Sequence, residues 1–216
     1  VQSVIDQIVN YLQPQQVIVD FSSLSVDKTK SLAKQVQSKN AVWIDSPVSG
    51  GTIGAEQGSL VIFAGGDAQV IESLAIMYEV LSQRVTRMGE TGTGQATKIC
   101  NQLIVAANST LIAEAVALAS LSGVDTTLLA PALAGGFADS KPFQILAPRM
   151  ATHTFEPVQW KVQTLSKDLN NAVKLAEQFN LDIPVAIRAL SQLQDHQMQG
   201  FSEADLATVI QHVESK

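Results

Sequence analysis

Residues 89–123 read GETGTGQATKICNQLIVAANSTLIAEAVALASLSG, and this stretch divides the chain into two parts. Three glycines come first, and a run of apolar and helix-forming residues follows as far as Gly123, a residue type that often ends helices. The pattern predicts one helix over about residues 94–122, with a length of roughly 43 Å. Because apolar residues occur nearly all round this helix, we expect it to be buried.

The residues before the long helix alternate between helical and strand patterns. Three short, largely apolar runs predict strands at residues 17–20, 41–45 and 59–66, and QRVTRMG predicts a fourth strand at residues 83–89. The first run is wholly apolar up to Asp20, which is typical of a buried strand in a parallel sheet. Apolar residues at helical spacing predict helices over residues 1–12, 25–40 and 67–82, the last two with Ser25 and Asp67 as N-caps. The alternation indicates an α/β layer.

The residues after the long helix carry no convincing strand pattern. Further helical segments follow between residues 124 and 216, without an internal repeat or a low-complexity linker. The sequence therefore predicts an α/β region followed by an all-α region, with residues 1–89 in the first domain and residues 90–216 in the second.

The composition is that of an ordinary globular protein, with 46% hydrophobic and 16% charged residues. The net charge is −6 and no run of lysine and arginine occurs, so we expect no nucleic-acid partner. Cys100 is the only cysteine, which excludes an internal disulfide and fits the reducing cytoplasm. Its place in the apolar helix predicts that Cys100 belongs to the core.

Polar residues and their spacing argue against a membrane span and against a metal site. The apolar helix contains four polar side chains that disfavour a membrane span, Asn101, Gln102, Asn108 and Glu114. The histidines are His153, His196 and His212. They are scattered and lack the spacing of metal ligands, so we predict no metal site.

The stretch DSPVSGGTIGAEQGSL at residues 45–60 follows a predicted strand and contains two adjacent glycines. Because Gly50 and Gly51 have no Cβ, their backbone N–H groups can approach a ligand closely, and a carboxylate suits such a nest. Ser49 adds a hydroxyl donor beside them. The residues alone are equally consistent with a plain turn at the end of a strand.

Lys98 is a cation in the first turns of the long helix, where the helix dipole disfavours positive charge. The dipole and partial burial both lower the pKa of a lysine at such a position, which would help the amine to give and take a proton near neutral pH. Asn101 lies three residues further on and shares the same helix face, so its amide can donate to a substrate and accept from it. The alternative interpretation of Lys98 is a surface lysine at a frayed helix start.

Three motifs, DSPVSGGTIGAEQGSL (45–60), GTGQATKICNQ (92–102) and KDLNNAV (167–173), carry a family resemblance. In this order they closely resemble the β-hydroxyacid dehydrogenases, which include 3-hydroxyisobutyrate dehydrogenase and tartronate semialdehyde reductase. The resemblance implies a partial Rossmann-type sheet followed by a helical domain built on one very long helix. It also implies that this chain, which starts at Val1, lacks the glycine fingerprint of the first βαβ units, roughly 60–80 residues.

The resemblance assigns a role to each residue of the first two motifs that could carry chemistry. It implies that Lys98 is the catalytic acid and base, with Asn101 as a second catalytic residue beside it. It places the carboxylate of the substrate on Ser49, Gly50 and Gly51.

The remaining assignments are less specific. Gln102, a predicted substrate-binding residue, stands where many relatives carry a second asparagine, which leaves open which of the two amides contacts the substrate. Lys167 and Asp168 match a cofactor-binding pair, although a solvated charge pair would look the same. Ser23 matches a hydroxyl residue near the nicotinamide and could equally be an ordinary loop serine.

The function that the resemblance implies is hydride transfer between NAD or NADP and a small β-hydroxyacid. 3-Hydroxyisobutyrate is one such substrate, and tartronate semialdehyde is one for the reverse reduction. The apolar helix predicts a homodimer or homotetramer, because one small domain can hardly bury it alone. The alternative is a non-catalytic dimerisation or binding module derived from a dehydrogenase, or an inactive fragment.

Overall fold

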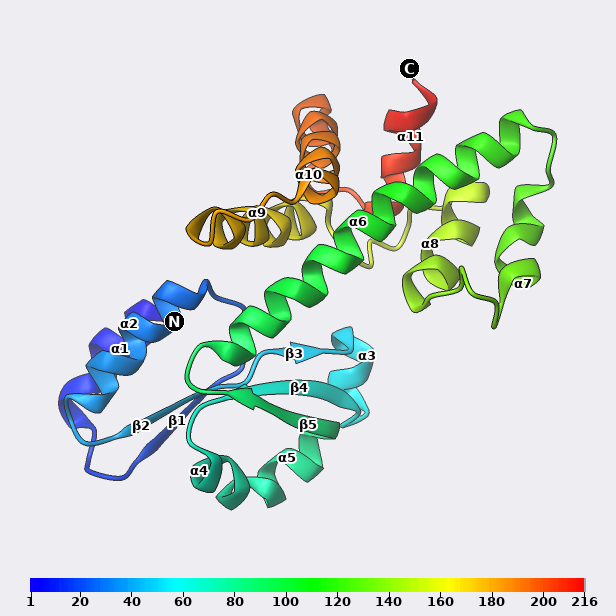
Figure 1. Cartoon of the computed structure of the whole chain (residues 1–216). Coiled ribbons are helices and arrows are strands. Elements are labelled where there is room, and N and C mark those ends of the chain that lie inside the picture. The colour runs from blue at the N-terminus through cyan, green and yellow to red at the C-terminus, as the bar shows by residue number, and fades with distance from the viewer. Residues whose placement is uncertain (216) are drawn as a thin grey trace. The chain divides into compact units, whose positions relative to one another are not determined.

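The structure is a computed structural model that describes residues 1–215. The chain divides into two compact units, and the division falls between Cys100 and Asn101, inside helix α6 (Thr93–Leu121). The first unit is a sheet with helices and the second is made of helices (Figure 1). The predicted order of an α/β region and an all-α region is confirmed, whereas the domain boundary at Gly89 stays a prediction.

The first unit is built on a five-stranded mixed sheet. Its strands are β1 (Val17–Asp20), β2 (Val42–Asp45), β3 (Val48–Ser49), β4 (Leu60–Gly65) and β5 (Ser82–Gly89). β1 and β2 are parallel, as expected, and so are β4 and β5, but β4 runs antiparallel to β2 and β3. Residues 50–59 between β3 and β4 are too few for the crossover that a parallel pair needs, so the sheet as a whole is mixed.

Helices cover both faces of this sheet (Figure 1). α1 (Gln2–Ile8) and α2 (Val26–Gln37) pack in one core cluster, and α4 (Ala68–Ser73) and α5 (Ala75–Leu81) pack in the other. α3 (Gly51–Glu56) lies at the end of β3 (Figure 1). Because successive strand residues point to opposite faces, Trp43 packs with Leu32 of α2, while Ile44 belongs to the cluster that holds Tyr78 of α5. The predicted N-caps are confirmed, since Ser25 accepts a hydrogen bond from the N–H of Lys28 and Asp67 from that of Val70.

β1 is less buried than its apolar sequence predicts. Val17, Ile18 and Val19 are half-buried, and only Asp20 at the end of the strand is buried. β1 lies at one end of the strand order, so within residues 1–215 it has a neighbour on one side only. The prediction of a fully buried strand is wrong for β1 and correct for most of β2.

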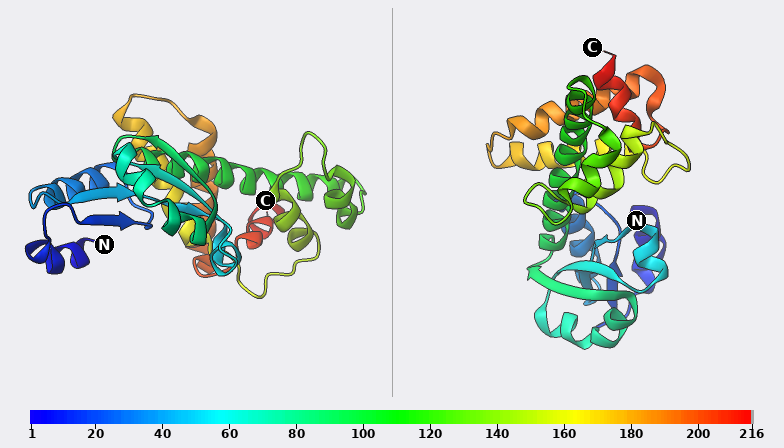
Figure 2. Two further views of the ribbon diagram at one scale, coloured as in Figure 1. Left: turned by 90° about the horizontal axis from the view of Figure 1, so that it is seen from below. Right: turned by 90° about the vertical axis from the view of Figure 1, so that its right-hand side faces the viewer.

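The second unit consists of helices, which both views in Figure 2 show. They are the main part of α6, then α7 (Leu129–Leu133), α8 (Lys141–Ala151), α9 (Val162–Gln178), α10 (Pro184–His196) and α11 (Val209–Glu214). Short 3₁₀ and π turns connect them at Thr126–Leu128, Gln197–Phe201 and Leu206–Thr208. Among residues 93–215 the structure has no strand, only an isolated bridge between Lys161 and Asp205.

α6 ends at the predicted glycine. Gly123 has a φ of +78°, a left-handed conformation that other residues adopt with strain. Its N–H donates to the carbonyl of Ser120 at 3.0 Å, and the N–H of Val124 donates to that of Ala119 at 3.0 Å. This pair of hydrogen bonds is a Schellman motif, which satisfies the last carbonyls of the helix.

The long helix is not buried all round within one chain. Ile104, Leu111 and Leu118 are 59%, 60% and 67% exposed, and their spacing of seven residues places them on one stripe. Residues 1–215 of one chain thus cover only part of the helix surface. Burial all round stays a prediction, because it includes contact with a second copy of the chain. By length and composition alone α6 could cross a membrane, a test that core helices of soluble proteins also pass. Two of its polar side chains, Gln102 and Glu114, instead bond to other helices of the second unit.

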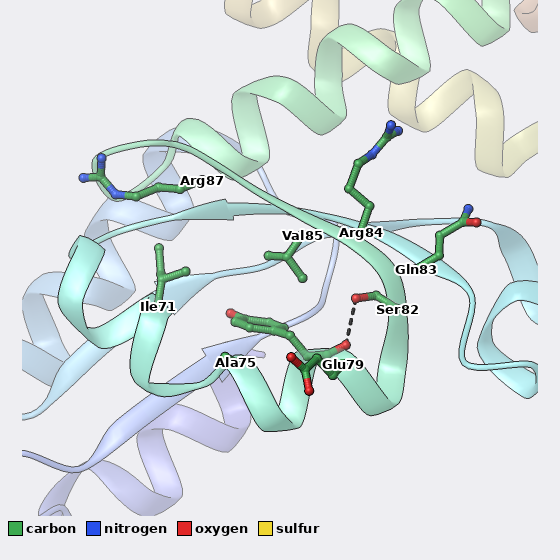
Figure 3. Close-up of a pocket in the computed structure, with 9 residues that line it drawn as sticks. Ile71, Ala75, Glu79, Ser82, Gln83, Arg84, Val85 and Arg87 are labelled. Carbon is green, nitrogen blue, oxygen red and sulfur yellow. Dashed lines mark hydrogen bonds between the residues drawn. The ribbon is translucent and has the colours of Figure 1, made fainter.

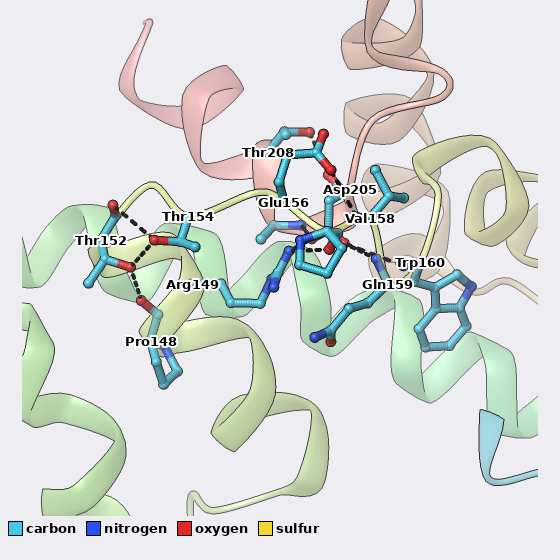
Figure 4. A network of polar contacts seen from close by, with 12 residues as sticks. Pro148, Arg149, Thr152, Thr154, Glu156, Val158, Gln159, Trp160, Asp205 and Thr208 are labelled. Atoms are coloured by element: carbon cyan, nitrogen blue, oxygen red, sulfur yellow. Dashed lines mark hydrogen bonds and ion pairs between the residues drawn. The ribbon is translucent and has the colours of Figure 1, made fainter. Parts of the chain in front are cut away.

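A buried ion pair fixes the loop after α8 (Figure 4). Asp205 is 2% exposed and accepts hydrogen bonds from the N–H groups of Gln159 and Ala207 at 2.7 and 3.0 Å. Arg149 lies 3.4 Å from the same carboxylate and also donates to the carbonyl of Pro157. A buried carboxylate costs free energy unless such donors surround it, so this loop and the turn at Asp205 hold each other in place.

Two of the histidines that look scattered in the sequence meet in the second unit. His196 is fully buried, stacks on Phe201 with ring centroids 4.3 Å apart, and lies 6.0 Å from the ring of His212. Its Nε2 is 2.8 Å from the hydroxyl of Thr208. Burial first, and then the neighbouring His212, lower the pKa of His196 from 6.5 to about 4.

We predict that acid destabilises the protein through His196. Its folded pKa of about 4 lies below the unfolded value, so between pH 6.5 and 4 the unfolded chain binds more protons. The free energy of unfolding should therefore fall by up to about 1.4 kcal/mol for each pH unit in this window. Urea denaturation of the His196→Gln variant should show a flatter pH dependence than that of the wild type. An unchanged slope in His196→Gln would contradict the prediction.

Candidate functional site

The start of α6 is held by a carboxylate from the sheet. Asp45, the last residue of β2, is fully buried. One of its oxygens accepts a hydrogen bond from the N–H of Gly92 at 2.7 Å, and the other from the N–H of Gln95 at 2.9 Å. These are backbone donors that a helix start leaves without intrahelical partners. Asp45 therefore caps a helix whose first residue lies 48 positions further along the chain than Asp45 itself, since α6 begins at Thr93.

Opposing effects act on the pKa of Asp45 in this cap. Burial raises the pKa of Asp45, whereas the hydrogen bonds from Gly92 and Gln95 lower it, and the negative charge of Asp20 raises it again. An anion at a helix N-terminus is also stabilised by the helix dipole. Tyr78 lies close by with a raised pKa, first because it is buried, and its hydroxyl is 2.7 Å from that of Ser46.

The glycines at the start of α6 are explained by packing. A Cβ on Gly94 would lie 2.4 Å from the carbonyl oxygen of Phe63 and 2.8 Å from that of Asp45. A Cβ on Gly65 of β4 would lie 2.7 Å from the carboxylate of Asp45. Only glycine lets the helix start approach the ends of β2 and β4 this closely. Gly92-Thr-Gly94 thus has a structural role at the start of α6.

Gln95 ties the loop after β1 to the same helix start. Its side chain is fully buried; Oε1 accepts from the N–H of Leu24 at 3.0 Å and Nε2 donates to the carbonyl of Ser22 at 2.7 Å. These two bonds flank Ser23, whose side chain is exposed. The loop is further fixed by the N–H of Ser22, which donates to Asp20 at 3.0 Å. A predicted cofactor contact therefore projects from a loop that α6 itself positions.

Sequence reasoning missed Asp45 and Gln95. Asp45 stands in one of the quoted motifs, but its sequence neighbours do not show that it caps a distant helix. Gln95 follows the glycines directly, and no periodicity marks it as buried. One signal for them is present in the sequence: Asp45 stands at the end of a predicted strand and Gln95 near the start of the predicted long helix, and both are polar.

Ser49, Gly50 and Gly51 form a turn between β3 and α3. Gly50 and Gly51 have φ values of +133° and +66°, and a Cβ on Gly51 would meet nothing within 4 Å. Both glycines are exposed and Ser49 is half-buried. The turn is thus open to solvent on the side of Gly51, and positive φ explains the two glycines whether or not the turn binds a ligand.

Lys98 is half-buried on α6, as the sixth residue of the helix. It lies in the second turn, where the field of the helix dipole has weakened, and the carboxylate of Asp45 lies against the positive end of that dipole. The dipole therefore acts less on Lys98 than the sequence alone suggests. Asn101 follows one turn later on the same helix and is also half-buried.

Four predicted site residues form a connected chain in the second unit. Asn101 donates from Nδ2 to Oε1 of Gln102 at 2.9 Å, and Gln102 donates from Nε2 to Asp168 at 2.6 Å. The ammonium of Lys167 lies 3.3 Å from the other oxygen of Asp168. Gln102 and Asp168 are 3% and 6% exposed, whereas Lys167 is exposed. Asp168 is therefore a buried carboxylate and Lys167–Asp168 is more than a solvated pair.

Three further observations concern residues outside this arrangement. Cys100 is exposed, so the prediction that it belongs to the core is wrong; it lies on a side of α6 that residues 1–215 leave uncovered. Trp43 is 1% exposed and packs in the core of the first unit. Within residues 1–215 no three histidine, cysteine, aspartate or glutamate side chains gather as a metal site would require.

A cavity of about 310 Å³ lies between α5 and β5 (Figure 3). Tyr78 and Glu79 of α5 line it together with Arg84 and Arg87 of β5. Figure 3 shows that Arg84 points away from Glu79. Arg87 is engaged with the carbonyl of Gly66 and with Glu90. None of the predicted site residues lines this cavity, so we assign it no role in the site.

The carboxyl end of β1 has features that fit a dinucleotide. In open α/β sheets ligands bind outside the carboxyl ends of parallel strands, and β1 and β2 form such a pair. Ser23 offers an exposed hydroxyl in the loop that follows β1. Oδ2 of Asp20 is buried and has no hydrogen-bond partner within residues 1–215, so it is an acceptor that a bound group could satisfy. These groups suit the amide-bearing nicotinamide half of NAD or NADP.

The sequence matches two models of dehydrogenase domains. Residues 1–89 match the NAD binding domain of 6-phosphogluconate dehydrogenase, and residues 92–213 match the model described as NAD-binding of NADP-dependent 3-hydroxyisobutyrate dehydrogenase. The second match covers more than half of the chain.

Similar proteins of known sequence are dehydrogenases and reductases. The chain is 38% identical to 2-hydroxy-3-oxopropionate reductase of Escherichia coli (strain K12), over 91% of the chain and 67% of that protein. It is 29% identical to the mitochondrial 3-hydroxyisobutyrate dehydrogenase of Drosophila melanogaster, over 89% of the chain and 61% of that protein. The chain thus spans about two thirds of the length of these relatives.

The fold is that of a solved dehydrogenase. The 3-hydroxyisobutyrate dehydrogenase of Mycobacterium tuberculosis, solved with L-serine, superposes with a TM-score of 0.88 at 22% identity. The superposition covers 98% of this chain and 75% of that chain. At this identity the likeness concerns the fold alone.

We predict that Asp45→Asn destabilises the first unit. The amide nitrogen of asparagine would face the N–H of Gly92 or Gln95, so one buried hydrogen bond would be replaced by two opposed donors. The free energy of unfolding should fall by about 1–3 kcal/mol in urea denaturation. Asp67→Asn is the matched control, because asparagine caps a helix such as α4 as well as aspartate does. Equal stability of the two variants would show that the cap on α6 is dispensable.

Proposed function

Because the chain belongs to the 3-hydroxyisobutyrate dehydrogenase family, we propose that it acts in hydride transfer between NAD or NADP and a small β-hydroxyacid. One observation carries the proposal beyond family membership. Lys98, a half-buried lysine, stands on a helix whose start is fixed by Asp45 and Gln95 to the ends of two strands. A scaffold without a reaction would not need a proton-transfer group at this place.

The cofactor, when bound, accepts a hydride from the carbon that bears the hydroxyl group or returns it. In the oxidation, the amine of Lys98 would take the hydroxyl proton as the hydride leaves; in the reduction, its ammonium would protonate the forming alkoxide. Asn101, one turn further along α6, would hold the hydroxyl group. Ser23 and the open acceptor of Asp20 would hold the nicotinamide.

The substrate class follows from two kinds of support. The exposed turn at Ser49, Gly50 and Gly51 can present backbone N–H groups to a carboxylate. The two relatives above are named for 2-hydroxy-3-oxopropionate, which is tartronate semialdehyde, and for 3-hydroxyisobutyrate. We therefore propose one of these small acids as substrate. Cys100 is exposed and is the only cysteine, which supports a reducing cytoplasm as the compartment.

We predict that Lys98→Ala lowers kcat by at least about 100-fold, the lower range for loss of an acid–base group. The assay should use the complete open reading frame that encodes this chain. It should follow the absorbance of NADH and of NADPH with 3-hydroxyisobutyrate and with tartronate semialdehyde. Lys174→Ala is the matched control, because Lys174 is an exposed lysine within α9. Folded wild-type protein without turnover of any acid would favour the non-catalytic module instead.

We also propose that the stripe of Ile104, Leu111 and Leu118 packs against a second copy of the chain. The three side chains are more than half exposed and recur every seven residues, the spacing at which helices pack side by side. An identical stripe on a partner would be complementary to it under two-fold symmetry.

Analytical ultracentrifugation tests this second proposal. The wild-type chain should sediment as a dimer or a larger assembly, and Leu111→Glu should shift it to the monomer. Ile76→Glu is the control, because Ile76 is 80% exposed on α5 in the first unit. A monomeric wild-type protein at micromolar concentration would overturn the proposal.

A further inference from the structure

The hydrogen bonds from Asn101 through Gln102 to Asp168 run in one direction, with each residue donating to the next. A carboxylate is only an acceptor, so the Asp168 oxygen 2.6 Å from Gln102 requires the NH₂ group of Gln102 to face it. The carbonyl oxygen of Gln102 then faces Asn101, 2.9 Å from Nδ2. Asn101 must therefore turn its NH₂ group toward Gln102 and its oxygen away from Gln102.

We propose that Asp168 acts through Gln102 as a positioning residue that fixes the amide of Asn101 with its oxygen as the group offered to a ligand. This inference rests on the proposed function, and it identifies the ligand group as a hydrogen-bond donor. In a β-hydroxyacid that donor is the hydroxyl group, whose single proton points to Asn101 while Lys98 is an ammonium and turns to the amine of Lys98 before that amine takes it.

Burial explains why the orientation would hold. Gln102 is 3% exposed, so rotating its amide would leave two buried acceptors against each other at Asp168. Such an unsatisfied contact costs about as much as a buried hydrogen bond or more. Lys167 lies 3.3 Å from the other oxygen of Asp168, and its positive charge attracts the negative carboxylate on which the direction depends.

The same contacts distinguish the two amides. Both ends of the Gln102 side chain are bonded within the protein, to Asn101 and to Asp168. Gln102 is thus a spacer in α6 that reaches α9, and Asn101 is the amide that meets the substrate. The longer side chain of glutamine, compared with asparagine, lets one residue span both contacts.

An exchange of the two end groups tests the direction without any assay of activity. In Asn101→Asp alone, a carboxylate faces the oxygen of Gln102, and the melting temperature should fall by about 2–4 °C or more for the lost hydrogen bond. Asp168→Asn alone should also lower it. In the double variant Gln102 can rotate, donate to the new carboxylate at position 101 and accept from the new amide at position 168. Asp168→Asn should therefore raise the melting temperature of the Asn101→Asp variant.

Two outcomes of the melting experiment would count against the proposal. Strictly additive losses in the double variant would overturn it, because no direction would then link the two ends. An equal effect of Asp182→Asn, which removes an exposed aspartate of the same unit, would mean that the rescue reflects net charge only.

The ligand half of the proposal is tested by binding to the complete open reading frame with cofactor present. 3-Hydroxyisobutyrate should bind more tightly than isobutyrate, which lacks the hydroxyl group, by about fivefold to tenfold for one hydrogen bond. Asp168→Ala, which removes the acceptor that orients Gln102, should weaken this preference. A preference that survives Asp168→Ala in full would overturn the positioning role.

Failure of the proposed function would look different from failure of the positioning role of Asp168. If neither acid binds while the double variant is still rescued in melting, the direction of the amides stands and the assignment of a hydroxyacid ligand falls. If both acids bind with the expected preference but the melting losses are additive, the proposed function stands and the positioning role of Asp168 is rejected.

Discussion

The buried carboxylate of Asp45 on the first turn of α6 is the interaction on which the rest of the structure depends. It joins the end of β2 to a helix of 29 residues that continues into the second unit. Burial raises the pKa of this carboxyl group, and the N–H groups of Gly92 and Gln95 offset that cost. Because both oxygens are used, the helix start is fixed in position and in rotation. The cap therefore also determines where Lys98 lies on the first turns of α6.

Close approach is the second constraint, and it follows from the first. The cap forms only if the helix start comes within contact of β2 and β4, where Gly65 and Gly94 leave no room for a Cβ. The same approach brings Gln95 to the loop that carries Ser23. A single packing arrangement thus sets the rotation of Lys98 about the helix axis and the course of the predicted cofactor loop, although these residues lie far apart in sequence.

Local features of the fold could be predicted from the sequence, and non-local ones could not. The four predicted strands, the N-caps Ser25 and Asp67 and the glycine end of α6 depend on neighbouring residues, and they are confirmed, whereas the two-residue strand β3 was not predicted. The direction of β4, the exposure of Cys100 and the meeting of His196 with His212 depend on which distant segments pack together. The motifs contain the predicted site residues Asn101, Gln102 and Asp168, but no spacing reveals that these three residues form one hydrogen-bonded chain.

The substitution of glutamine at residue 102 illustrates what geometry adds to a motif. In sequence, Asn101 and Gln102 look like two equivalent amides, either of which could bind a substrate. In the structure the carboxylate of Asp168 on α9 accepts a hydrogen bond from the NH₂ group of Gln102, which fixes the orientation of that amide. The oxygen of Gln102 then accepts from Asn101 and fixes the orientation of the Asn101 amide. A site that offers an oxygen rather than an NH₂ group stabilises an alcohol more than the carbonyl compound formed from it. On this argument the residue at position 102 would favour binding of the alcohol over binding of the carbonyl compound without contacting either, and the overall equilibrium of the reaction would stay the same.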